Sequence, residues 1–174
     1  LGGVMETFEV KRGLPKKLTS EGGLSALASK HFDSVDGEGN SFSGSHGIMS
    51  NITGEYNSLG KLVVDVNQVL PDFSDEDAMV AANDDRSRWS AFLDEATGYN
   101  SKQRSDKSKE WLKKASKAKS GISQAQKLME MSTNLSDEVK VQAESMIGEI
   151  EAALEAGDNT KAAGRAEKLG KLLG

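Results

Sequence analysis

A small or apolar residue recurs every three or four positions from residue 111 to residue 129. Steps of 4, 3, 4, 3 and 4 residues keep one face of an α-helix apolar for about three heptads. This spacing predicts that the chain after residue 100 is helical. The residues of this seam are Trp111, Ala115, Ala118, Ile122, Ala125 and Met129.

Two more amphipathic helices are expected before the C-terminus. Asn134 or Ser136 suits the N-cap of the first helix, which Gly157 ends, and Asp158 suits the N-cap of the second. Each helix must bury its apolar stripe on the others, on the N-terminal domain or on a partner. The stripes are Val139, Ala143, Met146, Ile150 and Ala153 or Leu154, then Ala162, Ala166, Leu169 and Leu173.

The N-terminal part has a different composition and is rich in glycine, serine and β-branched residues up to about Val69. One helix is expected over Lys16–Lys30, although each glycine of Gly22-Gly23 costs about 1 kcal/mol relative to alanine. We therefore expect an α+β fold: a small antiparallel sheet with packed helices over residues 1–100, then an all-α extension of three helices over residues 101–174. The predicted strands are Thr7–Lys11, His31–Val35, Ser41–Thr53 and Lys61–Val69.

A long helix is predicted between Ser74 and Gly98. Ser74 is a good N-cap, and the three acidic residues that follow it suit the positive end of the helix dipole. Polar residues from Asn83 to Ser87 interrupt the apolar face of this helix. Gly98 is expected just beyond its C-terminal end.

Composition excludes several chemistries. The chain has no cysteine, which rules out disulfides, cysteine-ligated zinc, iron–sulfur clusters and thiol nucleophiles. Its net charge of −5 argues against a generic nucleic-acid-binding protein. No apolar run approaches the roughly 20 residues that span a bilayer, and the N-terminal residues lack the apolar core of a signal peptide. We expect a cytoplasmic protein with no cofactor and no membrane contact.

The acidic, glycine-rich run DSVDGEGNSFSG raises the question of a calcium site. An EF-hand loop that starts at Asp36 requires glycine at its sixth position and glutamate at its twelfth, but Ser41 and Gly47 stand there. Gly37 and Gly39 instead suit the positive φ angles of a hairpin loop. The run is interpreted as a turn.

His31 and His46 are the two histidines of the chain, and they are expected on neighbouring strands near Asp33 or Asp36. Two histidines and a carboxylate can form a metal site or an acid–base site. Isolated histidines on a sheet are more often structural, so no catalytic or metal-binding residue is assigned.

A basic helix is the strongest interaction signal. Residues 101–120 contain eight Lys or Arg and two acidic residues. At about 100° per residue, four lysines form one stripe opposite the seam, which suits contact with a polyanion or a partner. The alternatives are a solvated face and pairing with the acidic stretch 72–95. This lysine stripe consists of Lys102, Lys109, Lys113 and Lys117.

The segments FEVKRG, HFDSV, LVVDV and FLDEATGYNSKQRSDKSK resemble a family of short uncharacterised archaeal proteins, known only as a domain of unknown function. The resemblance covers roughly Met5 to Lys119. It implies an archaeal source and a small α+β fold with an antiparallel sheet, and it brings no catalytic residues. The residues from about Ser120 onward extend beyond the usual length of this family.

Three functions are compatible with these patterns. The first is a non-enzymatic module for protein interaction or self-association, because the sequence has an amphipathic helical extension and no catalytic constellation. The second is nucleic-acid binding through the basic stripe at 102–117. The third is a small-molecule or catalytic site near His31 and His46.

Overall fold

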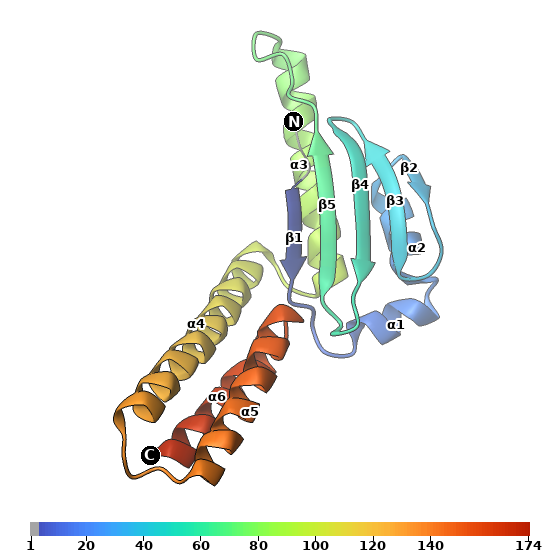
Figure 1. Ribbon diagram of the computed structural model, residues 1–174. Helices are drawn as coiled ribbons and strands as arrows, with labels where there is room; N and C mark the ends of the chain where they lie inside the picture. Colours follow the sequence, from blue (N-terminus) through green and yellow to red (C-terminus); the bar gives the residue numbers. More distant parts are fainter. Residues whose placement is uncertain (1–3) are drawn as a thin grey trace. The chain divides into compact units, whose positions relative to one another are not determined.

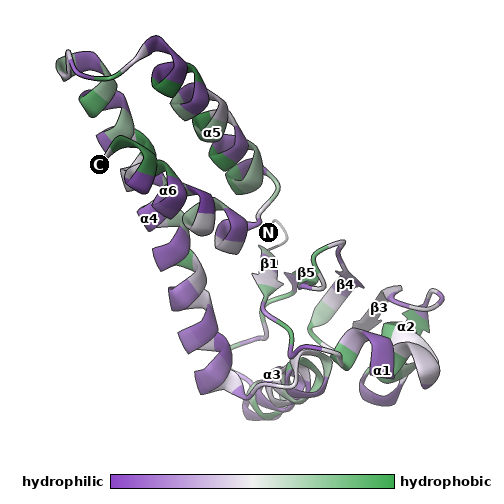
Figure 2. Cartoon of the chain, turned by 90° about the horizontal axis from the view of Figure 1, so that it is seen from below, coloured by the Kyte–Doolittle hydropathy of each residue, from purple (hydrophilic) through white to green (hydrophobic). Residues whose placement is uncertain are grey.

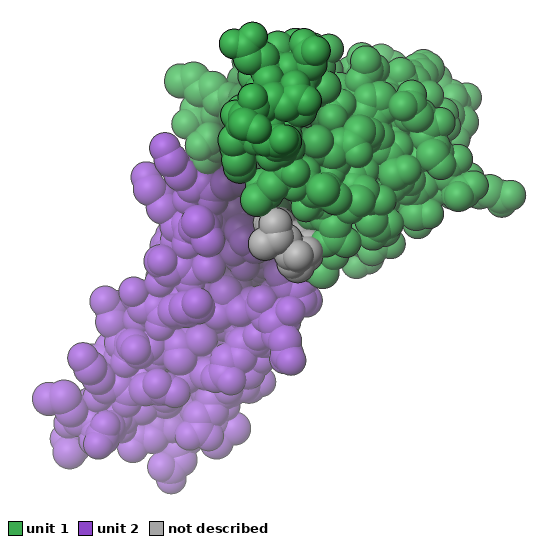
Figure 3. Space-filling model, turned by 90° about the horizontal axis from the view of Figure 1, so that it is seen from above, with its two compact units in different colours: residues 1–107 green, residues 108–174 purple. Residues whose placement is uncertain are grey.

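The chain has an α+β fold, as its sequence predicts, with a five-stranded antiparallel sheet followed by a helical region (Figure 1). The computed structural model describes residues 4–174. Hydrophobic and hydrophilic residues lie on different sides of helices such as α5 (Figure 2). The chain divides into two compact units, unit 1 at residues 1–107 and unit 2 at residues 108–174 (Figure 3).

The sheet of unit 1 has the strand order β1–β5–β4–β3–β2. Two helices connect β1 to β2, and a long helix follows β5. The strongest strand signal of the sequence, Leu62–Val66, lies in β5, which pairs with both β1 and β4. The strands are β1 (Val4–Phe8), β2 (Ser34–Asp36), β3 (Ser41–His46), β4 (Met49–Tyr56) and β5 (Leu62–Gln68), and the helices are α1 (Leu14–Ser20), α2 (Gly23–His31) and α3 (Glu76–Thr97).

The sheet has one strand more than the sequence predicts. Where one strand was expected over Ser41–Thr53, the structure has β3 and β4, with a turn at Gly47 between them. Gly47 adopts a φ of 53°, a left-handed conformation that glycine reaches without a steric penalty. Serine and asparagine residues, which are typical of turns, occur on both sides of this turn. The composition of the segment therefore does not indicate where the turn lies.

Three other boundaries differ from prediction. The expected Lys16–Lys30 helix is broken into α1 and α2, because Gly22 and Gly23 have φ angles of 102° and 81°. The strand expected from His31 begins at Ser34, since His31 is the last residue of α2. The first strand lies earlier than expected, because β1 pairs with β5 from Val4 to Phe8.

The α3 helix ends as predicted but begins one residue later. Its N-cap is Asp75, whose side chain accepts two backbone N–H bonds, while the Ser74 hydroxyl donates to the Asp72 carboxylate at 2.6 Å. The helix continues through the polar stretch after Ala82, where Asp85 is buried. Gly98, with a φ of 77°, ends it.

Residues 37–40 of the acidic, glycine-rich run form the turn between β2 and β3, which confirms its interpretation as a turn. Gly37 and Gly39 have φ angles of 132° and 64°. The Gly39 carbonyl accepts the Ser25 N–H at 2.9 Å, and Asn40 Oδ1 accepts the Leu24 N–H at 3.3 Å. The turn therefore caps the start of α2, where backbone N–H groups lack partners within the helix.

The core of unit 1 lies between the sheet and the helices α2 and α3, which pack on the same face (Figure 1). Phe92 of α3 is fully buried, and its ring centroid lies 5.1 Å from that of Phe32 and 5.5 Å from that of Phe42. Burial of such a side chain stabilises the fold by about 1.5–3 kcal/mol. None of the described helices of unit 1 covers the opposite face of the sheet.

Unit 2 contains α5 (Asp137–Glu155), α6 (Asn159–Leu173) and most of α4 (Ser101–Met131), which begins in unit 1. Ser136 and Asp158 are the N-caps of α5 and α6, as predicted. The Trp111 indole N–H donates to the Gly157 carbonyl at 3.3 Å, and the buried Asn159 amide donates to the Trp111 carbonyl at 3.0 Å.

The predicted seam of α4 packs within unit 2. Ala118 and Ala125 are buried, and the other four seam residues are half-buried. The large apolar side chains that remain exposed in this unit lie outside the seam. They are Leu112, Leu128, Met131 and Val141.

Candidate functional site

Five strands contribute one residue each to a row that crosses the face of the sheet opposite α2 and α3. Successive side chains of a strand point to opposite faces, so direct register partners share a face. Their neighbours in sequence, such as Phe42, Ile52 and Val64, are buried beneath the helices. This aspartate row consists of Asp36, Ser43, Thr53, Asp65 and Met5, from β2 to β1.

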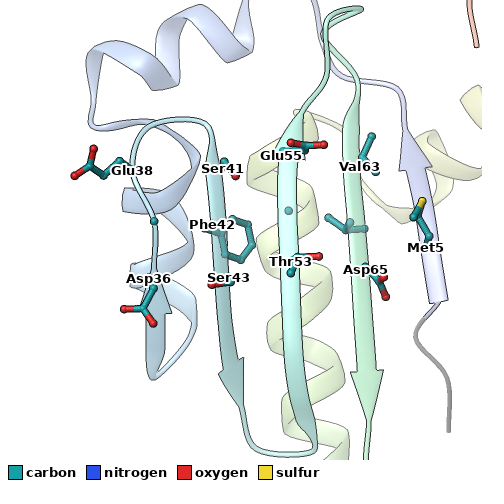
Figure 4. Close-up of a pocket in the computed structure, with 13 residues that line it drawn as sticks. Met5, Asp36, Glu38, Ser41, Phe42, Ser43, Thr53, Glu55, Val63 and Asp65 are labelled. Atoms are coloured by element: carbon teal, nitrogen blue, oxygen red, sulfur yellow. The ribbon is translucent and has the colours of Figure 1, made fainter. Parts of the chain in front are cut away.

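A second row lies beside the first on the same face. Ser41 pairs with Glu55, Glu55 with Val63, and Val63 with Thr7. Residues of both rows, together with Gly37 and Glu38 from the β2–β3 turn, line an open hollow of about 600 Å³ (Figure 4). We call these two rows and Glu38 the acidic face.

The hollow carries charge of one sign. Four carboxylates line it, from Asp36, Glu38, Glu55 and Asp65, and its lining includes no Lys, Arg or His. Serine and threonine hydroxyls lie between these carboxylates. A protein surface usually intersperses both signs, so a row of carboxylates without cations is a distinct feature.

Asp65 lies on β5 within the acidic face, with Thr53 and Met5 as its register partners. Its Oδ1 atom is buried and has no hydrogen-bond partner among the residues that the structure describes. A buried acceptor without a donor costs about 1–3 kcal/mol. Asp36, Glu38 and Glu55 are exposed, so their carboxylates can accept hydrogen bonds from a donor outside the chain.

The lysine stripe predicted from sequence lies along the exposed side of α4, whose first turns are largely hydrophilic (Figure 2). Lys102 belongs to unit 1, and its Nζ lies 3.8 Å from Asp106 Oδ2. The other three belong to unit 2. Lys109 and Lys113 are exposed without an ion pair in the described part of the chain, and Lys117 Nζ lies 3.7 Å from Glu167 Oε2.

Arg104 is a basic residue of this segment that the sequence analysis did not single out. It is buried, pairs with Asp94, and donates to the Tyr99 carbonyl at 2.7 Å and to Ser90 Oγ at 3.4 Å. Pairing between the basic segment and the acidic stretch 72–95 thus occurs through an arginine. Its planar guanidinium holds five N–H donors in a fixed fork, which suits contacts with several acceptors at once.

The two histidines have separate carboxylate partners. His31 Nε2 lies 3.2 Å from Glu95 Oε2, while His46 Nε2 lies 3.5 Å from Asp85 Oδ1. His46 Nδ1 accepts the Asp33 N–H at 3.2 Å and lies 3.3 Å from Asp33 Oδ2, so His46 is near Asp33 as predicted. Asp36, the other carboxylate considered from sequence, lies on the acidic face instead.

His46 and Asp85 hold the β3–β4 turn against α3. Asp85 is 8% exposed, and its Oδ2 accepts the Ile48 N–H at 2.9 Å. Within residues 4–174, no group of three or more His, Asp or Glu side chains is arranged to hold a metal ion. This geometry gives the His46–Asp85 pair a structural role.

Comparison with known proteins identifies one family. The model of the family described as Domain of unknown function (DUF5611) matches residues 5–110, which include the acidic face. No curated protein and no solved structure matches the chain. Among residues 4–174, no helix is both long and apolar enough to cross a membrane.

Proposed function

We propose that this chain, which belongs to the family described as Domain of unknown function (DUF5611), is a non-enzymatic protein-interaction module that binds a positively charged partner through its acidic face. The expected cytoplasmic location and archaeal source are part of this proposal. The resemblance of residues 5–119 supports the archaeal source.

The observation that carries the proposal is the combination of charge and exposure on the acidic face. An antiparallel sheet often leaves one face to solvent, and that alone requires no partner. Here four carboxylates line the hollow without a cation, and the buried Asp65 Oδ1 lacks a donor. A partner that brings ammonium or guanidinium groups would supply the missing positive charge.

The composition of the hollow suits a basic side chain. Its polar side chains are carboxylates and hydroxyls, whose oxygens accept hydrogen bonds from an ammonium or guanidinium group. The exposed Met5 and the half-buried Val63 add an apolar element. A lysine or arginine side chain, with its apolar stem and charged head, matches this mixture.

An NMR titration of the isotope-labelled full chain with an octalysine peptide tests the proposal. We expect amide shifts that centre on Asp36, Thr53 and Asp65. The variant D36N/E55Q/D65N should bind octalysine about tenfold more weakly, because three exposed ion pairs of a few tenths of a kcal/mol are lost. Shifts spread evenly over all exposed acidic residues would contradict the proposal.

A control variant with the same change of net charge distinguishes octalysine binding at the acidic face from attraction of octalysine to the net negative charge of the chain. Glu144, Glu151 and Glu155 are exposed on α5, and none has a salt bridge in the described residues. The variant E144Q/E151Q/E155Q should therefore keep the octalysine affinity of the wild type within about twofold. Equal losses in both variants would point to non-specific attraction.

Nucleic-acid binding through the lysine stripe is the second candidate. It is supported by Lys109 and Lys113, which are exposed and have no intramolecular ion pair among the described residues. It predicts binding to RNA or DNA that weakens steeply with salt, since lysines that contact phosphates release counterions. Titrations of the K109E/K113E/K117E variant beside the wild type, at low salt, test this candidate.

A further inference from the structure

We infer that the partner of the acidic face is the lysine stripe of a second copy of this chain. This inference rests on the proposed function and names its partner. In that contact, Lys109, Lys113 and Lys117 of one copy lie over the carboxylates of Asp36, Glu55 and Asp65 of the other.

Complementary charge is the first argument. The acidic face carries carboxylates without cations, and the exposed side of α4 carries lysines, two of which have no acidic partner in the described residues. Acidic faces repel each other, and lysine stripes do as well, so a contact between like surfaces is disfavoured. The favoured contact joins the sheet of one copy to α4 of another.

Matching dimensions are the second argument. Lys109 and Lys117 are eight residues apart on α4, which corresponds to about 12 Å along the helix axis. Asp36 on β2 and Asp65 on β5 belong to one row across three strand-to-strand gaps, which corresponds to about 14 Å. If α4 of one copy lies across the strands of the other, its lysines span about the same length as the row of carboxylates.

Apolar side chains extend the match. Leu112 follows Lys109 by three residues, which makes the two neighbours on the helix surface, and it is 59% exposed. On the acidic face, Met5 is 70% exposed beside its register partner Asp65, and Val63 is half-buried beside its register partner Glu55. A contact between Leu112 and these two side chains would remove apolar surface from water on both copies.

The contact should be weak and sensitive to salt, because exposed ion pairs contribute little individually and ions screen them. Size-exclusion chromatography with light scattering on the full chain measures it. We expect self-association at about 0.5 mM protein in about 50 mM salt, and an association constant at least about tenfold lower in about 500 mM salt. A monomer under both conditions overturns the inference.

A charge-reversal experiment identifies the two surfaces. The variant D36K/E55K/D65K and the variant K109E/K113E/K117E should each be monomeric alone, because each then presents two surfaces of the same sign. An equimolar mixture should associate again, since the positive sheet of one variant faces the negative helix of the other. Restored association also shows that both variants are folded, and a mixture that stays monomeric overturns the inference.

A third variant controls for net charge. E144K/E151K/E155K changes the charge of the chain by the same amount as D36K/E55K/D65K but leaves the acidic face intact. It should retain the self-association of the wild type, which D36K/E55K/D65K should lose. Association that tracks net charge in all three variants would overturn the inference.

The octalysine titration distinguishes failure of this inference from failure of the proposed function. Octalysine shifts on the acidic face of a chain that stays monomeric overturn the self-association and leave the interaction module standing. No shifts and no self-association overturn both. RNA binding that depends on Lys109, Lys113 and Lys117, without self-association, overturns the inference in favour of the nucleic-acid candidate.

Discussion

The Tyr56 hydroxyl donates a 2.6 Å hydrogen bond to the Ala96 carbonyl and thereby joins the end of β4 to the last turn of α3. The last carbonyls of a helix have no partner within it. The next carbonyl of α3, that of Thr97, accepts the Lys11 N–H at 2.8 Å. The end of α3 is thus fixed to the sheet by residues that are distant in sequence.

Replacing Tyr56 with Phe should lower the free energy of unfolding by about 1 kcal/mol, because the Ala96 carbonyl loses its donor. Urea denaturation measures this loss. Tyr99→Phe serves as the control, since the Tyr99 hydroxyl makes no hydrogen bond in the described residues and its ring contacts Lys107. Equal losses in the two variants would contradict the role of the Tyr56–Ala96 bond.

Alkaline pH provides a second test of Tyr56. Burial raises the pKa of Tyr56 above its ordinary value of 10.0. Above about pH 10 the phenol ionises in the unfolded chain but stays neutral in the folded state. The contribution of Tyr56 to stability is therefore complete below about pH 10, and it declines as pH rises further. Stability above about pH 10 should fall less steeply in Tyr56→Phe than in the wild type.

Asp85→Ala should destabilise the fold by about 1–3 kcal/mol, because the Ile48 N–H then lacks its acceptor. The neighbouring Asp84 is exposed, so Asp84→Ala should change the free energy of unfolding by about 0.5 kcal/mol or less. Hydrogen exchange at the Ile48 amide should become faster only in Asp85→Ala. Unchanged exchange there would show that the carboxylate does not hold the β3–β4 turn.

Asn40→Ala should cost about 1 kcal/mol, the usual effect of losing a helix cap. Asn40 Oδ1 accepts the Leu24 N–H at the start of α2, and Asn40 Nδ2 donates to Thr19 Oγ1 at 3.0 Å. Asn40→Asp keeps the acceptor and adds a negative charge that the helix dipole favours, so it should retain most of the stability. Thermal unfolding of the two variants measures the difference, and equal melting temperatures would argue against the cap.

Gly121→Ala and Gly148→Ala should have opposite effects, although both glycines lie inside helices. A Cβ at Gly121 would lie 2.9 Å from the Ala166 Cβ, so α4 and α6 would have to move apart. A Cβ at Gly148 would meet no atom within 4 Å, and alanine there should add about 0.5–1 kcal/mol of helix stability. Denaturation curves of both variants measure the sign, and stabilisation by Gly121→Ala would show that the two helices do not pack closely there.

Local signals explain why the helical part was predictable. The seam of α4, the caps Ser136 and Asp158 and the ends of helices at Gly98 and Gly157 all depend on residues within a few positions of one another. Helical periodicity also placed Lys109 and Lys113 on an exposed side. Arg104 was missed, because its partners on α3 come together with it only in the folded unit.

The sequence by itself determined the α+β class, the helices with most of their ends, the strand β5 and the exclusion of cysteine chemistry. Only the tertiary structure decided the β3–β4 hairpin and the acidic face. The alternation of polar and apolar residues indicates which side chains of one strand share a face. It does not indicate which other strand pairs with that strand. Asp36, Ser43, Thr53 and Asp65 belong to four strands, and the pairing register alone aligns them in one row.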